Sequence, residues 1–186
     1  SSGVSLLELT NAYSVFANQG YRVEPVFVRK IFDRDGNVLQ DATPLREKVI
    51  DQSTAYIMTS LLEGVVQHGT GRRVRALNRP AAGKTGTTNN LFDAWFMGFT
   101  PRYITGTWVG FDEERSLGEG ETGSRAASPI WLGFMKQVLE GKPIRVFEAP
   151  EGIVFAKIDA KTGLLPIRES EQTSFECFKE GTVPTE

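Results

Sequence analysis

The stretch Ala82-Gly83-Lys84-Thr85-Gly86-Thr87-Thr88 carries the most information in this chain of 186 residues. It places a cation, three hydroxyl groups and a side-chain-free residue on one short extended segment. Lys84 supplies a point charge and the threonines supply hydrogen-bond donors, while Gly86 lets a ligand backbone approach closely. A substrate main chain lying along such a strand edge would also gain ladder hydrogen bonds. The segment is a candidate anion-binding strand, although composition alone equally allows a polar turn with a solvated lysine.

Gly83-Lys84-Thr85 also matches the last three positions of a phosphate-binding P-loop. That motif requires a glycine five residues before Gly83, where this chain has Asn78. Gly86 is a poor first residue for the helix that a P-loop must open. We therefore do not interpret the stretch as a nucleotide site.

The pattern around this stretch predicts three closely spaced strands, at residues 81–88, 94–100 and 103–111. Both faces of the second strand are apolar, because Phe96 alternates with Trp95 and Met97, so we expect both faces to be covered. Upstream, an Asp-Gly turn within residues 33–37 separates two apolar runs and predicts a hairpin.

Three amphipathic helices accompany these strands. The first is expected to begin at a capping box of Ser5 and Glu8, and the second to run from about Asp51 to Gln67. The third is expected to be capped by Ser128, with Pro129 at its first position. The inward-facing stripes are predicted to be Leu6, Leu9, Tyr13 and Phe16; Ile57, Met58, Leu61, Leu62, Val65 and Val66; and Trp131, Phe134, Met135, Val138 and Leu139. We expect an α+β fold, an antiparallel sheet flanked by helices, followed by a short β-rich tail from Ile153.

Composition excludes several classes of protein. Hydrophobic residues make up 40% and charged residues 24%, as in an ordinary globular protein, and the net charge of −2 argues against nucleic-acid binding. No apolar run approaches the roughly 20 residues of a membrane helix, so we expect this segment to be soluble. The single cysteine, Cys177, excludes an internal disulfide and a multi-cysteine metal site.

Lys84-Thr85-Gly86-Thr87 resembles the third signature of the penicillin-recognising serine transferases and β-lactamases. Its surroundings resemble the transpeptidase domain of class A (bifunctional) penicillin-binding proteins along nearly the whole chain. The similar stretches are residues 5–9, 12–20, 69–72, 83–88, 93–101, 109–112, 126–131 and 162–165. The resemblance implies a transpeptidase-like fold that is incomplete here. It divides the chain into the C-terminal portion of a transpeptidase domain, residues 1–148, and a β-rich C-terminal tail, residues 149–186.

The chain departs from this family at its nucleophile. The family uses Ser-x-x-Lys and Ser-x-Asn motifs, and no serine of this sequence has lysine three positions later or asparagine two positions later. Both motifs normally precede the point where this chain starts, which is Ser1 rather than an initiator methionine. We expect an N-terminal remainder of the same protein to carry both motifs and a membrane anchor, and the isolated fragment to be catalytically inactive.

The resemblance implies a D,D-transpeptidase acting on peptidoglycan stem peptides and trapped by β-lactams, at the extracytoplasmic face of a bacterial membrane, without cofactor or metal. Lys84 and Thr87 would be catalytic: Lys84 in the charge and proton network, and Thr87 through a backbone N–H in the oxyanion hole. Thr85, Gly86, Thr87 and Thr88 would bind the substrate, with the Thr85 and Thr87 hydroxyls on its carboxylate.

Other candidate residues have simpler interpretations. His68, the only histidine, falls at a predicted helix end. Arg72, Arg73 and Arg75 are compatible with an acidic partner or with a solvated loop, and the second is favoured. The carboxylates at 112–114 and 119–121 are interpreted as acidic loop surface, the tryptophans Trp95, Trp108 and Trp131 as core, and Cys177 as a thiol without an activating partner.

Two alternative functions stay open. A non-catalytic penicillin-recognising sensor or binding module of the same fold would keep the Lys84–Thr87 strand without turnover. A β-lactamase fragment fits less well, because of the long tail after Pro150.

Overall fold

A three-stranded antiparallel sheet forms the centre of the computed structural model, which describes residues 3–167 and 172–185. Its strands are β5 (Ala82–Thr87), β6 (Asp93–Phe99) and β7 (Ile104–Gly110), in the order β5-β6-β7. The three predicted strands are confirmed, each end lying one residue from its expected position. In the register Lys84 pairs with Met97, and Gly86 with Trp95.

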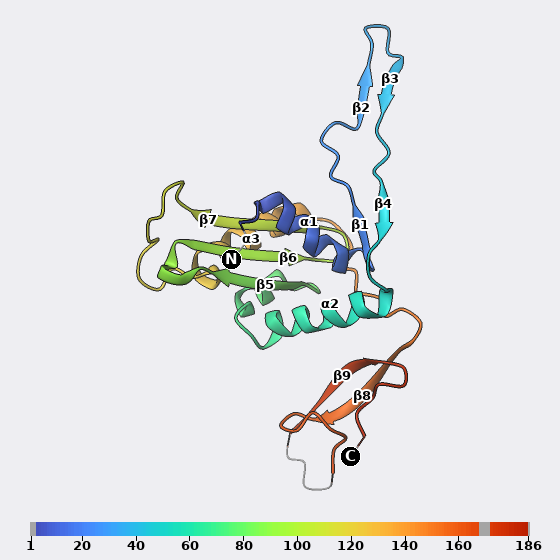
Figure 1. Ribbon diagram of the computed structural model, residues 1–186, viewed down its shortest axis with the longest axis vertical. Coiled ribbons are helices and arrows are strands. Elements are labelled where there is room, and N and C mark those ends of the chain that lie inside the picture. The colour runs from blue at the N-terminus through green and yellow to red at the C-terminus, as the bar shows by residue number, and fades with distance from the viewer. Residues whose placement is uncertain (1–2, 168–171, 186) are drawn as a thin grey trace.

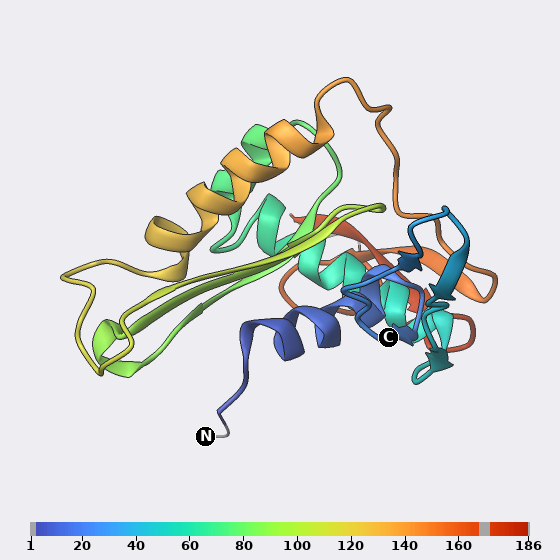
Figure 2. The same cartoon turned by 90° about the horizontal axis from the view of Figure 1, so that it is seen from above.

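Helices cover both faces of this sheet (Figure 2). The helix α1 (Leu6–Ala17) lies on the Met97 face, where the Thr10 hydroxyl is 3.8 Å from the Met97 sulfur. The helix α3 (Ser128–Leu139) lies on the Phe96 face, with the Phe96 and Trp131 rings 5.3 Å apart. The helix α2 (Gln52–Gln67) packs against β5. The central strand is therefore buried on both faces, and the expected α+β class is confirmed.

Trp131 anchors the core between α3 and the sheet. Its ring is fully buried, and its indole N–H is shared between the carbonyl oxygens of Gly98, at 3.2 Å, and Thr105, at 3.0 Å. A β-carbon on Gly98 would come 2.8 Å from this ring, so the close packing of helix and strand needs glycine there.

The first two helices begin as expected. Ser5 and Glu8 form the capping box of α1, and the Asp51 carboxylate accepts a 2.8 Å hydrogen bond from the Thr54 N–H at the start of α2. Hydrogen bonds from Thr54 and then from Lys179 hold the pKa of Asp51 well below its usual range.

The third helix begins differently from the expectation. Ser128 does not cap it; its hydroxyl donates to the Ser124 carbonyl at 2.8 Å, because α3 continues directly from a π-helical turn, η3 (Gly123–Ala127). The apolar stripes were also predicted too wide. Leu61 on α2 is 57% exposed and Phe134 on α3 is 51% exposed, whereas Trp131 and Met135 on α3 are fully buried.

Two antiparallel ribbons project from this body in opposite directions (Figure 1). The predicted turn at 33–37 is confirmed, since the Asp33 carboxylate accepts from the Asn37 N–H at 2.9 Å. Within the tail that was expected to be β-rich, residues 173–179 form a strand. The basic stretch of Arg72, Arg73 and Arg75, interpreted from sequence as a solvated loop, lies in a short 3-10 helix. The elements are β1 (Tyr21–Val23) paired with β4 (Arg46–Lys48), β2 (Lys30–Phe32) with β3 (Val38–Asp41), β8 (Ile153–Asp159) with β9 (Thr173–Lys179), and the 3-10 helices η1 (Arg72–Leu77) and η2 (Asn89–Leu91).

Within the described residues no helix is long and apolar enough to cross a membrane.

Candidate active site

The predicted anion-binding strand is the edge strand β5, and all five predicted site residues, from Lys84 to Thr88, line one groove of about 700 Å³. Residues of α1, among them Leu9 and Tyr13, form its other wall. Trp95 and Trp108 line it as well. The site is therefore an apolar-walled groove with its polar groups concentrated along one strand.

The backbone direction of β5 follows from its last hydrogen bond. The Thr88 N–H donates to the Asp93 carbonyl at 3.1 Å and so points toward β6. Successive residues of an antiparallel strand point their N–H and C=O groups to opposite sides. Thr85 and Thr87 therefore present these groups to the open edge. The Lys84 ammonium, 2.9 Å from the Thr85 carbonyl oxygen, lies on that same edge.

The Thr85 hydroxyl is joined to a residue that the sequence interpretation missed. Its oxygen lies 2.6 Å from the hydroxyl oxygen of Thr70, in the loop after α2. This loop is fixed because the N–H groups of Gly69 and Gly71 both donate to the Val65 carbonyl, each at 3.0 Å. In the sequence, Gly69-Thr70-Gly71 marks the end of a helix, and nothing local indicates where the Thr70 hydroxyl points.

Thr87 is hydrogen-bonded to η3, the turn that leads into α3. Its hydroxyl oxygen accepts a 3.1 Å hydrogen bond from the Gly123 N–H at the start of η3. Gly123 sits directly on the backbone of β5 and β6, where a β-carbon would overlap the carbonyl oxygens of Gly86 and Trp95. The Thr87 oxygen accepts this hydrogen bond, and its own hydrogen stays available to donate to a second partner.

Lys84 carries the positive charge of the groove. Its side chain is exposed, and no carboxylate in the described part of the chain forms an ion pair with it. The ammonium has three hydrogens, of which the Thr85 carbonyl takes one. The groove therefore combines a free cation, oriented hydroxyls and open backbone groups, which together suit an extended ligand with an anionic group.

Thr88 has a different position from its neighbours. Its hydroxyl oxygen accepts from the Asp93 N–H at 2.8 Å, which closes the turn between β5 and β6. The Asp93 carboxylate in turn accepts from the Trp108 indole N–H at 2.8 Å. Trp131 is core as predicted, but the interpretation of Trp95 and Trp108 as core is wrong: both line the groove, where Trp95 is half-buried and Trp108 is 37% exposed.

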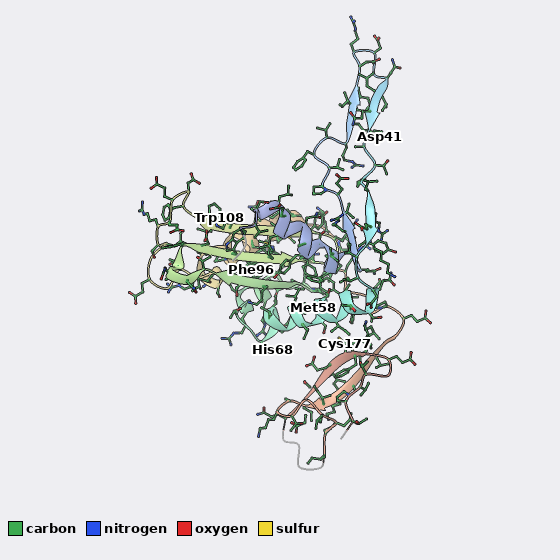
Figure 3. All side chains as sticks on the ribbon, viewed as in Figure 1. Asp41, Met58, His68, Phe96, Trp108 and Cys177 are labelled. Carbon is green, nitrogen blue, oxygen red and sulfur yellow. The ribbon has the colours of Figure 1, made fainter. Side chains whose placement is uncertain are left out.

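The remaining candidates lie outside the groove. His68 is exposed at the C-terminus of α2, as predicted, and Cys177 is half-buried on β9 (Figure 3). The described residues contain no cluster of three or more histidine, cysteine or acidic side chains that could hold a metal ion. The described residues that line the groove include neither serine nor cysteine, so they supply no hydroxyl or thiol of the usual nucleophile types except threonine and tyrosine.

Two family descriptions match the chain. Residues 1–130 match the penicillin-binding protein transpeptidase domain. Residues 149–186 match the C-terminal domain of penicillin-binding protein 1A.

Relatives and solved structures agree with these matches. Penicillin-binding protein 1A of Aquifex aeolicus is 42% identical over 97% of this chain and 25% of that protein. The corresponding protein of Pseudomonas aeruginosa is 37% identical over 97% of this chain and 28% of its own length. The crystal structure of penicillin-binding protein 1A from Haemophilus influenzae superposes with a TM-score of 0.91 at 33% identity, covering 98% of this chain and 33% of that one.

The chain thus spans about a quarter of the length of the curated relatives it matches. The match to the transpeptidase domain at residues 1–130 includes the whole of the edge strand β5 and of the helices α1 and α2, and the first three residues of α3. By sequence and by fold, the chain belongs to the penicillin-binding protein transpeptidase family.

Proposed function

We propose that this chain is the substrate-holding part of a peptidoglycan D,D-transpeptidase, with β5 as the strand along which the stem peptide lies. The observation that carries the proposal is the open edge of β5, where Thr85 and Thr87 turn their backbone groups away from β6. An extended peptide can add to such an edge as a further strand. The family membership and the name of the relatives, penicillin-binding protein 1A, support a peptide and its β-lactam mimics as ligands.

The terminal carboxylate of the peptide, or the carboxylate of a β-lactam, would be bound by hydroxyl groups and by the Lys84 ammonium. Thr87 already accepts from Gly123, so its own hydrogen is free for an anion. Of the Thr70 and Thr85 hydroxyls, one donates its hydrogen to the oxygen of the other. The hydrogen of the accepting hydroxyl is therefore also free for the carboxylate. Hydrogen bonds to a charged acceptor are the stronger kind, which favours a carboxylate over a neutral group.

The chemical step needs a serine from the remainder of the longer protein. That serine would attack the carbonyl of the penultimate D-alanine, and the negative charge would develop on the carbonyl oxygen. The backbone N–H of Thr87, on the open edge, would donate to this oxygen, a contact typically worth about 3 kcal/mol of transition-state stabilisation. Terminal D-alanine would leave, and an amine of a neighbouring strand would take the acyl group.

The isolated chain is proposed to be inactive, because its sequence contains no Ser-x-x-Lys. Fluorescent penicillin followed by gel electrophoresis tests this directly. The chain alone should remain unlabelled, while the longer polypeptide that contains it should be labelled. Covalent labelling of the chain alone would overturn the idea that the nucleophile lies elsewhere.

A non-catalytic sensor or binding module remains the second candidate, favoured by the same absence of a serine motif within these residues. The sequence upstream of Ser1 separates the two. Ser-x-x-Lys and Ser-x-Asn in that sequence would support the enzyme, and neither motif would favour the module.

The proposal also covers the division of the chain and its location. We assign residues 1–148 to the transpeptidase portion and 149–186 to a separate C-terminal unit, in line with the family matches at 1–130 and 149–186. The substrate would place the chain on the extracytoplasmic face of the membrane. Protease accessibility in whole cells and in spheroplasts measures that location.

A further inference from the structure

A second groove, of about 490 Å³, lies away from β5 at the junction of the two parts of the chain. One wall is the end of α1 and the start of α2, including Phe16, Gln19 and Gln52. The other wall is a segment at residues 144–148, which we call the strap. The strap belongs to the connection from α3 to β8, drawn in orange past the first turn of α2 in Figure 1. The residues lining this groove and those lining the candidate active site do not overlap.

The strap leaves its backbone unpaired. It belongs to no helix or strand, and across the described residues no N–H or C=O group of the strap takes part in a hydrogen bond. Four of its five residues are exposed, so these groups face water, which the main chain of an incoming peptide can replace. The strap therefore presents unpaired backbone N–H and C=O groups beside the groove.

Packing holds the strap in place without using these groups. The Phe147 ring contacts the Phe99 ring edge-on, with centroids 5.7 Å apart, and so ties the strap to the end of β6. Ile144 and Val146 remain 63% exposed. Five extended residues span roughly 16 Å, so a peptide of similar length would be enough to pair along the strap.

The polar side chains around the groove also lack strong partners. Arg145 and Glu148 form no ion pair with any described residue. The Gln19 and Gln52 amides contact each other at 3.5 Å, which leaves most of their donors and acceptors available. Amides, one cation and one anion beside the Phe16 ring form a mixed lining that suits a peptide better than a polyanion, which needs several cations.

We propose that this groove binds an extended peptide segment, which adds as a strand to residues 144–148 and places a carboxylate side chain against Arg145. Main-chain hydrogen bonds to the strap would supply affinity, and the charge on Arg145 would supply selectivity. The site is independent of the proposed transpeptidase function, since it uses none of the residues of the β5 groove.

Selection from a phage-displayed library of random heptapeptides against the folded chain tests the proposal. We expect the selected peptides to be enriched in Asp or Glu at one position. A synthetic copy of one selected peptide is then titrated by fluorescence anisotropy against the chain and two charge-reversal variants. Arg145→Glu should weaken binding by about tenfold, the loss of one charged contact, whereas Arg102→Glu, on the neighbouring exposed turn, should change it less than about twofold.

Amide chemical shifts locate the bound peptide. Changes centred on residues 144–148 support the proposal, and changes centred on β5 contradict it. Failure to select any peptide, equal affinity for Arg145→Glu, or absence of an acidic preference would each overturn it. The same peptide should also bind the longer polypeptide; loss of binding there would mean that another part of that polypeptide covers the strap, and the proposal would be wrong.

Discussion

The hydroxyl oxygens of Thr70 and Thr85 lie 2.6 Å apart, joining the loop after α2 to the open edge of β5. At this distance one hydroxyl donates to the other, and the pair keeps a single hydrogen for a ligand. Thr70 thereby becomes part of the candidate site, although it is 15 residues from Thr85 in the sequence. The loop cannot shift easily, because the N–H groups of Gly69 and Gly71 are both hydrogen-bonded to the Val65 carbonyl near the end of α2.

We predict that Thr70→Val slows acylation of the longer polypeptide by penicillin by about tenfold, the value of one hydrogen bond to a charged group. The valine removes the partner that orients Thr85. Thr70→Ser keeps a hydroxyl at the same position and should retain most of the rate. The rate of labelling by fluorescent penicillin is the measurement, and equal rates for Thr70→Val and the unchanged protein would contradict the role.

Thr87→Val should also slow acylation by at least about tenfold, because it removes a hydroxyl that is proposed to bind the ligand carboxylate. Valine suits a strand, so the fold should be retained. The Gly123 N–H loses its acceptor, which should cost about 1 kcal/mol in the free energy of unfolding. Urea denaturation and the labelling rate separate the two effects. Unchanged acylation kinetics would remove the hydroxyl of Thr87 from the proposed role.

Gly123→Ala is predicted to destabilise the chain by about 2 kcal/mol, since its β-carbon would overlap the carbonyl oxygens of Gly86 and Trp95 and push η3 away from β5. Gly133→Ala is the matched control, because a β-carbon at Gly133 meets open space within α3. Alanine favours a helix over glycine, so the control should be stabilised by up to about 1 kcal/mol. Urea denaturation of both variants tests the contrast, and similar effects would refute the close contact.

The strands and helices of the body could be predicted from sequence because their periodicities are local. The cap of α1, the cap of α2 and the turn at 33–37 each depend on residues within four positions of each other. The strand β9 was not predicted, since Thr173, Ser174 and Glu176 give it a polar composition. Its strand character depends on pairing with β8.

The candidate site was predicted only along β5. Its lysine, glycine and threonines form one short motif, whereas Thr70 and Gly123 reach it through contacts across 15 and 36 residues of sequence. Local pattern also could not separate Trp108 from Trp131. Both are large and apolar, but Trp131 lies on α3 and is buried against Phe96, whereas Trp108 pairs with Trp95 on the other face of the sheet and remains 37% exposed.

Glu63 on α2 provides a prediction about pH. Burial raises the pKa of this carboxyl from 4.5 to about 7, and no described residue forms an ion pair or hydrogen bond with its side chain. Well below pH 4.5 the Glu63 carboxyl is neutral in both the folded and the unfolded state, so its burial does not lower the free energy of unfolding through its charge. As the pH rises toward 7, the unfolded state ionises more easily than the folded state, and the free energy of unfolding falls.

Glu63→Gln should therefore match the unchanged chain in stability at pH 4 and exceed it at pH 8. The side chain is only half-buried and partly screened by water, so we expect a gain of about 1.5 kcal/mol rather than the full value of the pKa shift. Urea denaturation at several pH values between 4 and 8 measures the difference. The gain should develop between pH 4.5 and 7, and then stay constant, because both states of the unchanged chain are ionised above that range. A difference that is the same at every pH would mean that the glutamine acts through packing and that the carboxyl of Glu63 does not titrate as described.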